Sequence, residues 1–153
     1  MNLGGIKQIR LKDRPLFCRL VYSDLRGGGL LKSEKHDLRG KPDLVFQSRF
    51  TGRPTPMELK SGEVEKGPHY GDVMQLVAYF VIVEEAMGKR PKRGFLRYKN
   101  AMFVVKNSGR RRRELFGILA DMRKMLETGE GSANPSFVRC RHCLARDTVC
   151  TKK

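Results

Sequence analysis

The sequence of 153 residues predicts an α/β protein. Short alternating or apolar runs, which are typical of strands, fill most of the first 60 residues and return after residue 92. A long apolar segment with helical periodicity lies between these two groups, and an amphipathic one follows them. Because 39% of the residues are hydrophobic, the chain can bury one modest core, in which strands and helices are expected to pack together.

The expected strands are short runs that end at Gly, Pro or Asn turns. They lie at 5–11, 15–23, about 30–35, 43–49, 56–60, 93–99 and 101–106. Gly27–Gly29 marks the turn after the second run, and residues 51–54 turn the chain from the fourth run into the fifth. These two hairpin partners, 43–49 and 56–60, are expected to pair.

Two segments are expected to be helices. Apolar residues cover most of the circumference of Tyr70–Met87, so this helix should be buried against a sheet, and Gly88 ends it. The last helix, at about 110–127, has its apolar residues on one stripe. The stripe consists of Leu115, Ile118, Leu119, Met122 and Leu126. We expect a single domain over residues 1–136, with a cysteine-rich tail at 137–153 packed on it.

The charge of the chain indicates its partner. With 32 Lys and Arg against 16 Asp and Glu, the formal net charge is +16. Such a surplus favours a polyanion and argues against acidic proteins and cationic metabolites. Residues 86–113 contain eleven Lys or Arg and no acidic residue, which favours a phosphate-binding surface over a merely solvated face. The expected DNA contacts include the four residues that open the last helix, Arg110, Arg111, Arg112 and Arg113.

The sequence also predicts a cytoplasmic protein. The longest apolar run, Leu76–Val83, is far shorter than the roughly 20 residues that cross a membrane. The first residues lack the apolar stretch of a secretory signal. Three of the four cysteines lie in the last fourteen residues, which suits a metal or cluster site in a reducing cytosol better than a set of disulfides.

Two carboxylates and a lysine are predicted to converge. Asp43 begins one strand of the hairpin and Glu58 ends the other, so a turn near Gly52 brings them side by side. Lys60 is two residues beyond Glu58 and therefore on the same face of the strand. In a chain with 31% charged residues this pattern also arises by chance. However, Glu58 lies in a strand that should be buried, where a metal would compensate its charge.

This set has the chemistry of phosphodiester hydrolysis. Carboxylate oxygens of Asp43 and Glu58 would bind Mg²⁺ or Mn²⁺, and the backbone carbonyl of Leu59 is a possible further ligand. Lys60 would orient the attacking water or stabilise the pentavalent transition state. Gln75 and Tyr79, four residues apart on an otherwise apolar helix, share one face and are predicted to contact a nucleic-acid strand.

These residues carry a resemblance. Gly40-Lys-Pro-Asp43, Pro56-Met-Glu-Leu-Lys-Ser-Gly62 and Gln75-Leu-Val-Ala-Tyr79 resemble the motifs of RecB-type nucleases of the PD-(D/E)XK superfamily. Within it, the chain is most similar to the CRISPR-associated RecB-like exonucleases of spacer acquisition, over roughly residues 19–150. The resemblance implies a restriction-endonuclease-like mixed sheet flanked by helices. It also implies metal ligands at Asp43 and Glu58, a catalytic Lys60, and DNA contacts by Gln75 and Tyr79.

The chain differs from that family near its start. Family members usually begin with a helical segment that bears a Cys-Pro-Arg-like motif and, farther on, a metal-binding His. Here the chain is expected to begin directly in strands. His36 lies close in sequence to the Asp43 motif, but not where the family has its ligand. His69 precedes the apolar helix and is expected to be an ordinary loop residue rather than a DNA contact.

The cysteine tail predicts a metal or cluster site. Cys140, Cys143 and Cys150 have the spacing of metal ligands, and Cys18 is the remaining cysteine. By resemblance the three tail cysteines would help to hold a [4Fe–4S] cluster, and Cys18, as the only other cysteine, is the candidate for the fourth ligand. Zinc is the alternative, with Cys18 or His142 completing the site. Cys18 can also be a small buried hydrophobic residue.

Three functions remain open from the sequence. The first is a metal-dependent DNA exonuclease that acts on single-stranded ends and trims precursors for CRISPR integration, together with the integrase proteins. The second is a non-catalytic DNA-binding subunit of an integration complex. The third is a structure-specific endonuclease, against which the Gln75 and Tyr79 pair argues. The presence of all three residues Asp43, Glu58 and Lys60 favours catalysis over a degenerate scaffold.

Overall fold

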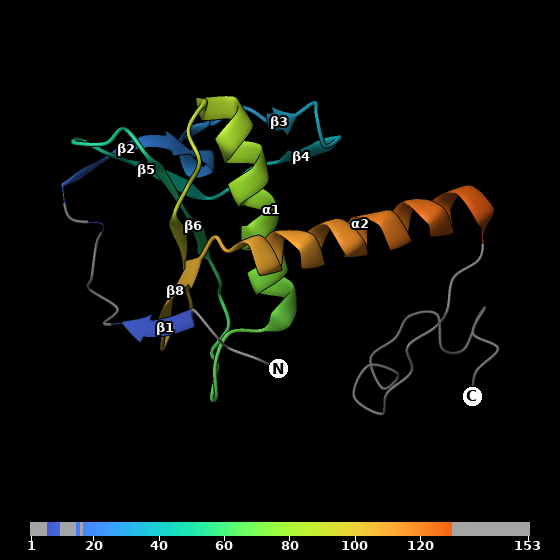
Figure 1. Ribbon diagram of the computed structural model, residues 1–153. Coiled ribbons are helices and arrows are strands. Elements are labelled where there is room, and N and C mark those ends of the chain that lie inside the picture. The colour runs from blue at the N-terminus through green and yellow to red at the C-terminus, as the bar shows by residue number, and fades with distance from the viewer. Residues whose placement is uncertain (1–5, 10–14, 16, 130–153) are drawn as a thin grey trace. The chain divides into compact units, whose positions relative to one another are not determined.

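A computed structural model describes residues 6–9, 15 and 17–129 (Figure 1). It contains a six-stranded sheet and a separate two-stranded sheet. The strands are β1 (Ile6–Ile9), β2 (Cys18–Ser23), β3 (Leu31–Ser33), β4 (Leu38–Gly40), β5 (Leu44–Ser48), β6 (Pro54–Leu59), β7 (Arg93–Arg97) and β8 (Met102–Lys106). The helices are α1 (Tyr70–Met87), α2 (Gly109–Thr128) and the short 3-10 helix η1 (Asp24–Arg26). The predicted α/β class and mixed sheet are confirmed.

The large sheet has the strand order β1-β8-β7-β6-β5-β2. Each neighbouring pair is antiparallel except β6 and β7, which are parallel. A parallel pair needs a crossover connection, and α1 supplies it. Consequently β6 and β7 begin at the same end of the sheet and finish at the other, where the predicted carboxylates lie.

Helix α1 is the centre of the core, as its composition predicts. Nine of its residues are buried, and Leu76, Phe80 and Val83 are completely so. The helix packs against β6 and β7 and also against the β3–β4 hairpin (Figure 1). Gly88 ends it with a φ of +67°, the left-handed conformation that glycine adopts most easily.

The predicted strands agree with the observed ones to within a few residues, with one omission. Residues 38–40, for which no strand was predicted, form β4, which pairs with β3. The β3–β4 hairpin is held to α1 by Glu85, whose carboxylate accepts hydrogen bonds from Ser33 and from two backbone amides of the hairpin. Residues 41–43 connect β4 directly to β5.

Helix α2 has the predicted position, but only part of its apolar stripe is buried. The chain divides into two compact units after Phe116, so the helix contributes to both. Leu115 of the expected stripe is buried, whereas Met122 and Leu126 are 50% and 79% exposed. The expected domain boundary at 136 lies outside the described residues. Within the described part of the chain, neither helix combines the length and the apolar character needed to cross a membrane.

Candidate active site

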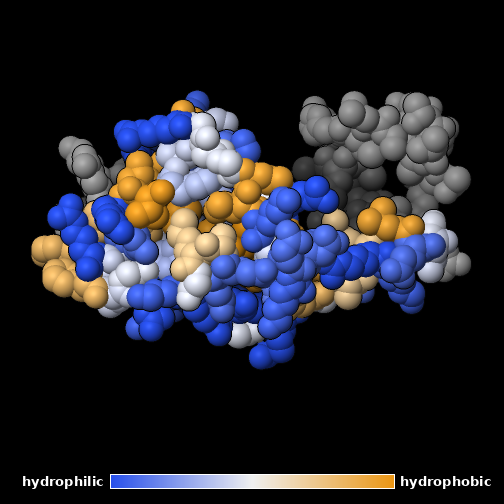
Figure 2. Space-filling model, turned by 90° about the horizontal axis from the view of Figure 1, so that it is seen from above, coloured by the Kyte–Doolittle hydropathy of each residue, from blue (hydrophilic) through white to orange (hydrophobic). Residues whose placement is uncertain are grey.

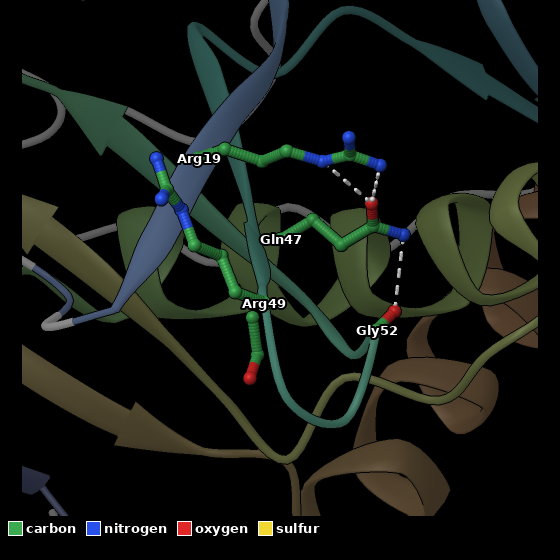
Figure 3. Close-up of a pocket in the computed structure, with 5 residues that line it drawn as sticks. Arg19, Gln47, Arg49 and Gly52 are labelled. Atoms are coloured by element: carbon green, nitrogen blue, oxygen red, sulfur yellow. Dashed lines mark hydrogen bonds between the residues drawn. The ribbon is translucent and has the colours of Figure 1, made fainter.

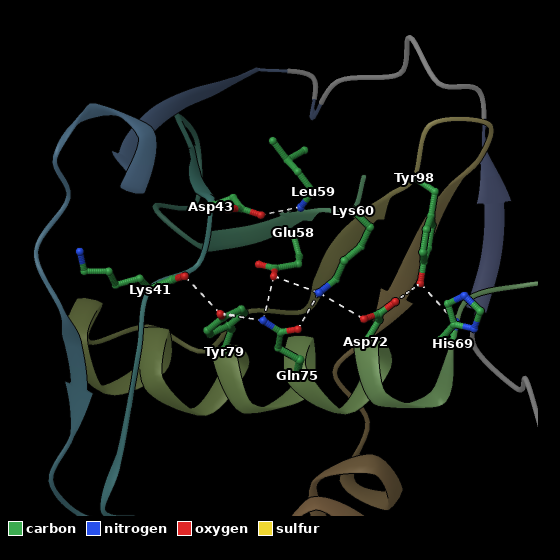
Figure 4. Close-up of polar contacts among 10 residues, drawn as sticks. All are labelled: Lys41, Asp43, Glu58, Leu59, Lys60, His69, Asp72, Gln75, Tyr79 and Tyr98. Carbon is green, nitrogen blue, oxygen red and sulfur yellow. Dashed lines mark hydrogen bonds and ion pairs between the residues drawn. The ribbon is translucent and has the colours of Figure 1, made fainter. Parts of the chain in front are cut away.

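Asp43 and Glu58 lie side by side at one end of the sheet, as predicted. Strands β5 and β6 pair Leu44 with Met57, which places the preceding and following residues next to each other. The Asp43 Oδ2 atom accepts a hydrogen bond of 2.7 Å from the backbone N–H of Leu59 (Figure 4). The turn that makes this register possible contains Gly52, with a φ of +64°.

Glu58 has a buried carboxylate, and one of its two oxygens has no hydrogen-bond partner among the described residues. Its side chain points toward α1, and the residue is only 7% exposed. The Oε1 atom accepts hydrogen bonds from Gln75 Nε2 at 2.8 Å and from Lys60 Nζ at 3.3 Å. The Oε2 atom is buried and receives no hydrogen bond from any described residue. A buried acceptor without a donor is costly, which makes Oε2 the natural contact for a cation.

The surroundings of Glu58 also disfavour its charge. Burial raises the pKa of the Glu58 carboxyl, and the neighbouring charge of Asp43 raises it further. Lys60 acts in the opposite direction but does not cancel these effects. Two close carboxylates in a partly buried place favour the binding of a positive ion, because the ion stabilises both charged forms.

Lys60 is held by three side chains. Its Nζ atom donates to Gln75 Oε1 at 2.7 Å and lies 3.1 Å from Asp72 Oδ1, in addition to the contact with Glu58 (Figure 4). Burial by itself would lower the pKa of the ammonium, but hydrogen bonds and charges from Asp72 and Glu58 outweigh it and raise the pKa. The Lys60 ammonium is therefore expected to stay charged, and its three side-chain partners fix its position.

Gln75 and Tyr79 share a face of α1, as predicted, and both belong to this cluster. Gln75 Nε2 lies 3.0 Å from the Tyr79 hydroxyl, which in turn donates to the backbone carbonyl of Lys41 at 3.1 Å. Gly40 makes room for the tyrosine ring, since a Cβ there would lie 2.9 Å from the ring atom Cε1. The predicted contact of this pair with DNA stays a prediction.

Two residues of the cluster escaped the sequence analysis. Asp72 receives a 2.6 Å hydrogen bond from the Tyr98 hydroxyl through Oδ2 and contacts Lys60 through Oδ1. The Tyr98 hydroxyl also accepts a hydrogen bond from the backbone N–H of His69 at 3.2 Å. Asp72 lies one helical turn before Gln75, a spacing that would have revealed it. Tyr98 follows β7 and has no comparable local signal.

The remaining predicted residues lie elsewhere. The ring of His36 packs against Phe116, with 4.8 Å between the centroids. No three Cys, His, Asp or Glu side chains form a metal-binding group among the residues that the structure describes, so His36 does not complete one with Asp43 and Glu58. Cys18 is half-buried in β2, opposite Ser48 at the far end of β5. Cys140, Cys143, Cys150 and His142 lie outside the described residues.

The four arginines at the start of α2 differ in their surroundings. Arg111 is buried and donates to the backbone carbonyl of Lys106 at 3.3 Å, and Arg112 forms an ion pair with Glu84 of α1. Arg110 and Arg113 are exposed. Two of the four predicted DNA contacts thus have structural roles in holding α2.

Comparison with known proteins does not add to this picture. No protein-family model matches the chain, and none of the curated proteins matches it significantly.

Proposed function

We propose that this protein is a metal-dependent deoxyribonuclease that hydrolyses phosphodiester bonds at the cluster of Asp43, Glu58 and Lys60. The observation that carries the proposal is the buried Oε2 atom of Glu58, which has no hydrogen-bond partner among the described residues and lies next to a second carboxylate. An ammonium group fixed at the same place adds the third element that phosphodiester hydrolysis uses. The net charge of +16 supports a nucleic acid as the substrate.

The donor atoms fit Mg²⁺ or Mn²⁺. Asp43 and Glu58 supply hard oxygen ligands, and an ion that keeps several waters needs few more from the protein. The backbone carbonyl of Leu59 is the possible further ligand that the sequence suggests. When bound, such an ion lowers the pKa of a water ligand and offsets negative charge on the phosphate.

The protein side chains would position the reacting groups. The Lys60 ammonium is the proposed donor to the attacking water or to the charged oxygens of the transition state. Gln75 fixes both partners, because its amide donates to Glu58 and its carbonyl oxygen accepts from Lys60. Asp72 contacts Lys60 from the other side, and the Tyr98 hydroxyl in turn donates to Asp72. Preorganised contacts of this kind avoid rearrangement during the reaction.

The finer assignment rests on the resemblance of the three motifs. It suggests an exonuclease that acts on single-stranded ends and trims precursors for CRISPR spacer acquisition, in company with the integrase proteins. A non-catalytic DNA-binding subunit is the second candidate. The fixed position of Lys60 favours the enzyme, since a scaffold that only binds DNA does not require a partly buried ammonium between two carboxylates.

A cleavage assay tests the proposal. Linear single-stranded and duplex DNA, labelled at either end, and circular single-stranded DNA would be incubated with Mg²⁺, Mn²⁺ or EDTA. We expect metal-dependent shortening of the linear strands from an end, with the circle intact. A cut circle would indicate an endonuclease. Binding without cleavage under every metal condition would favour the non-catalytic subunit.

Asp72 provides a test of the positioning network. Asp72→Asn should lower kcat by about 10- to 100-fold, because Lys60 loses its charged partner while the substituted side chain keeps its shape. Asp72→Glu should recover part of the loss, which a merely structural effect would not predict. Cleavage rates and thermal melting of both variants check this. Equal rates in Asp72→Asn and the parent protein would contradict the role of Asp72.

The iron–sulfur cluster proposed for the cysteine-rich tail can be tested by measuring the iron and sulfide content of the protein. Protein purified without oxygen should contain iron and sulfide, and Cys140→Ala, Cys143→Ala or Cys150→Ala should each remove most of the iron, since each removes one thiolate ligand. Cys18→Ala decides whether β2 supplies the fourth ligand. Zinc in place of iron would contradict the [4Fe–4S] assignment and leave the nuclease proposal unaffected.

A further inference from the structure

Most of the Lys and Arg residues of segment 86–113 lie at the opposite end of the sheet from the proposed active site. The cluster of Asp43, Glu58 and Lys60 is at the end of β6, whereas the connections that precede β6 and β7 lie at the opposite end of these parallel strands. A cleft of about 480 Å³ opens there, which we call the distal cleft. It is lined by Arg53, Arg90, Pro91, Lys92, Arg93, Lys106, Asn107 and Ser108.

The distal cleft is strongly cationic. Of the eight described residues that line it, five are Lys or Arg and none is acidic. All five are exposed, and none forms an ion pair with a carboxylate among the residues that the structure describes. Cations brought together without anions repel one another and create a positive potential. An anionic ligand would relieve this repulsion.

The walls of the cleft are tied together by hydrogen bonds. The Asn107 backbone N–H donates to the Lys92 carbonyl at 3.0 Å, and its side-chain Nδ2 donates to the Pro91 carbonyl at 2.8 Å. The Arg53 guanidinium donates to the Arg90 carbonyl at 3.4 Å. The Asn107 Oδ1 atom is buried and receives no hydrogen bond from the described residues. The cleft is therefore preformed and retains one unused acceptor.

A second basic cleft continues the surface across the β5–β6 turn. It has a volume of about 580 Å³, and its lining includes Arg19, Gln47 and Arg49 (Figure 3). The Arg19 guanidinium donates twice to Gln47 Oε1, which orients it, while Lys89 Nζ donates to the Thr51 carbonyl of the turn between the two clefts. Hydrophilic side chains cover much of the end of the molecule where α1 finishes (Figure 2).

We propose that the distal cleft binds the phosphate backbone of a nucleic acid, as a second contact separate from the Asp43, Glu58 and Lys60 cluster. None of the described residues that line it is aromatic, so we expect no base stacking and a contact that is independent of sequence. The inference deepens the proposed function, on which it rests for the choice of DNA as the polyanion.

The separation of the two sites sets a minimum length for a ligand that reaches both. Strand β6, with 6 residues, spans the distance between them. At about 3.3 Å per residue this is about 20 Å. Successive phosphates of one strand of a duplex advance about 3.4 Å along the helix axis, so a duplex aligned with β6 needs about six base pairs to bridge the sites. A shorter duplex in this orientation can occupy only one of them.

The test compares two triple variants that change the charge equally. Arg90→Gln, Lys92→Gln and Lys106→Gln together remove three exposed cations from the distal cleft. The matched control is Lys32→Gln, Lys35→Gln and Arg39→Gln on the β3–β4 hairpin, whose side chains are also exposed. Affinities for labelled duplexes of 5 and 20 base pairs would be measured by fluorescence anisotropy in EDTA, at several salt concentrations.

For the 20-base-pair duplex, the distal variant should bind at least about tenfold more weakly at low salt. The slope of log K against log salt should become shallower by about 2–3, since each lost phosphate contact changes it by about 0.9. The control variant should lose much less. The 5-base-pair duplex can occupy only one site, so the parent protein should bind it much more weakly than the 20-base-pair duplex.

Two results would overturn the inference: equal losses in the distal and control variants with the 20-base-pair duplex, or a parent protein that binds both lengths equally well. Because the measurements are made without metal, they do not depend on cleavage. A protein that shows the expected length effect but never cleaves DNA would refute the nuclease proposal and support the second contact. Thermal melting of both triple variants identifies any loss of folding.

Discussion

Glu58→Gln is expected to lower metal-dependent DNA cleavage by about 10²–10³-fold and to leave DNA binding in EDTA nearly unchanged. The glutamine has the same shape and keeps an oxygen that can accept from Gln75 and Lys60. However, it loses the negative charge and places an amide where the buried Oε2 atom now lies. Initial rates in Mn²⁺ and Mg²⁺, measured beside binding in EDTA, check this expectation.

Glu63→Gln is the matched control for this variant. Glu63 is an exposed carboxylate in the loop after β6, only five residues from Glu58, and its replacement changes the net charge equally. Its cleavage rate should stay within about twofold of the parent rate, as expected for a surface substitution without special contacts. If Glu58→Gln were as active as Glu63→Gln, the assignment of Glu58 as a metal ligand would be wrong.

The convergence of Asp43 and Glu58 was predictable because a short hairpin determines its own register. The turn that contains Gly52 leaves few ways to pair the flanking strands, and the two carboxylates follow from that pairing. Gln75 and Tyr79 were predictable for the same reason: helical spacing alone places them on one face. Local geometry was sufficient in both cases.

The contribution of Tyr98 required tertiary information. It reaches Asp72 because β7 pairs in parallel with β6, with Leu59 opposite Arg97. Nothing near Tyr98 in the sequence specifies that neighbour, since a parallel pair joins segments separated by a whole helix. The same topology placed the basic connection before β7 at the far end of the sheet, so its charge was predictable but its distance from Glu58 was not.

Burial was harder to predict than secondary structure. The apolar stripe of α2 correctly indicated a helix, yet Met122 and Leu126 are exposed. Periodicity shows which residues share a face, and it does not show whether another element covers that face. Arg111 illustrates the converse. Its place in a run of arginines favoured an exposed DNA contact, but the side chain is buried and bonded to the carbonyl of Lys106.

The close approach of α1 to the sheet depends on Gly94 of β7. A Cβ at this position would lie 2.7 Å from the Phe80 ring, 2.8 Å from the Pro56 carbonyl oxygen and 3.1 Å from Leu76 Cδ1. The Phe80 and Leu76 side chains are completely buried, and the carbonyl belongs to the backbone of β6, so none of them can move freely. Leu76 is also the neighbour of Gln75, which contacts Glu58. Packing at Gly94 thus supports the geometry of the cluster.

Gly94→Ala is therefore expected to destabilise the protein by about 2–3 kcal/mol, the usual cost of an overpacked core. The melting temperature should fall by roughly 5–10 °C.

Gly71→Ala introduces the same methyl group in the first turn of α1, where no atom lies within 4 Å of the new Cβ. It should raise stability by up to about 1 kcal/mol through helix propensity. Thermal unfolding of the two variants, followed by circular dichroism, should show shifts of opposite sign. Equal melting temperatures would mean that β7 and α1 can separate at little cost, and Gly94 would then not determine how closely Gln75 approaches Glu58.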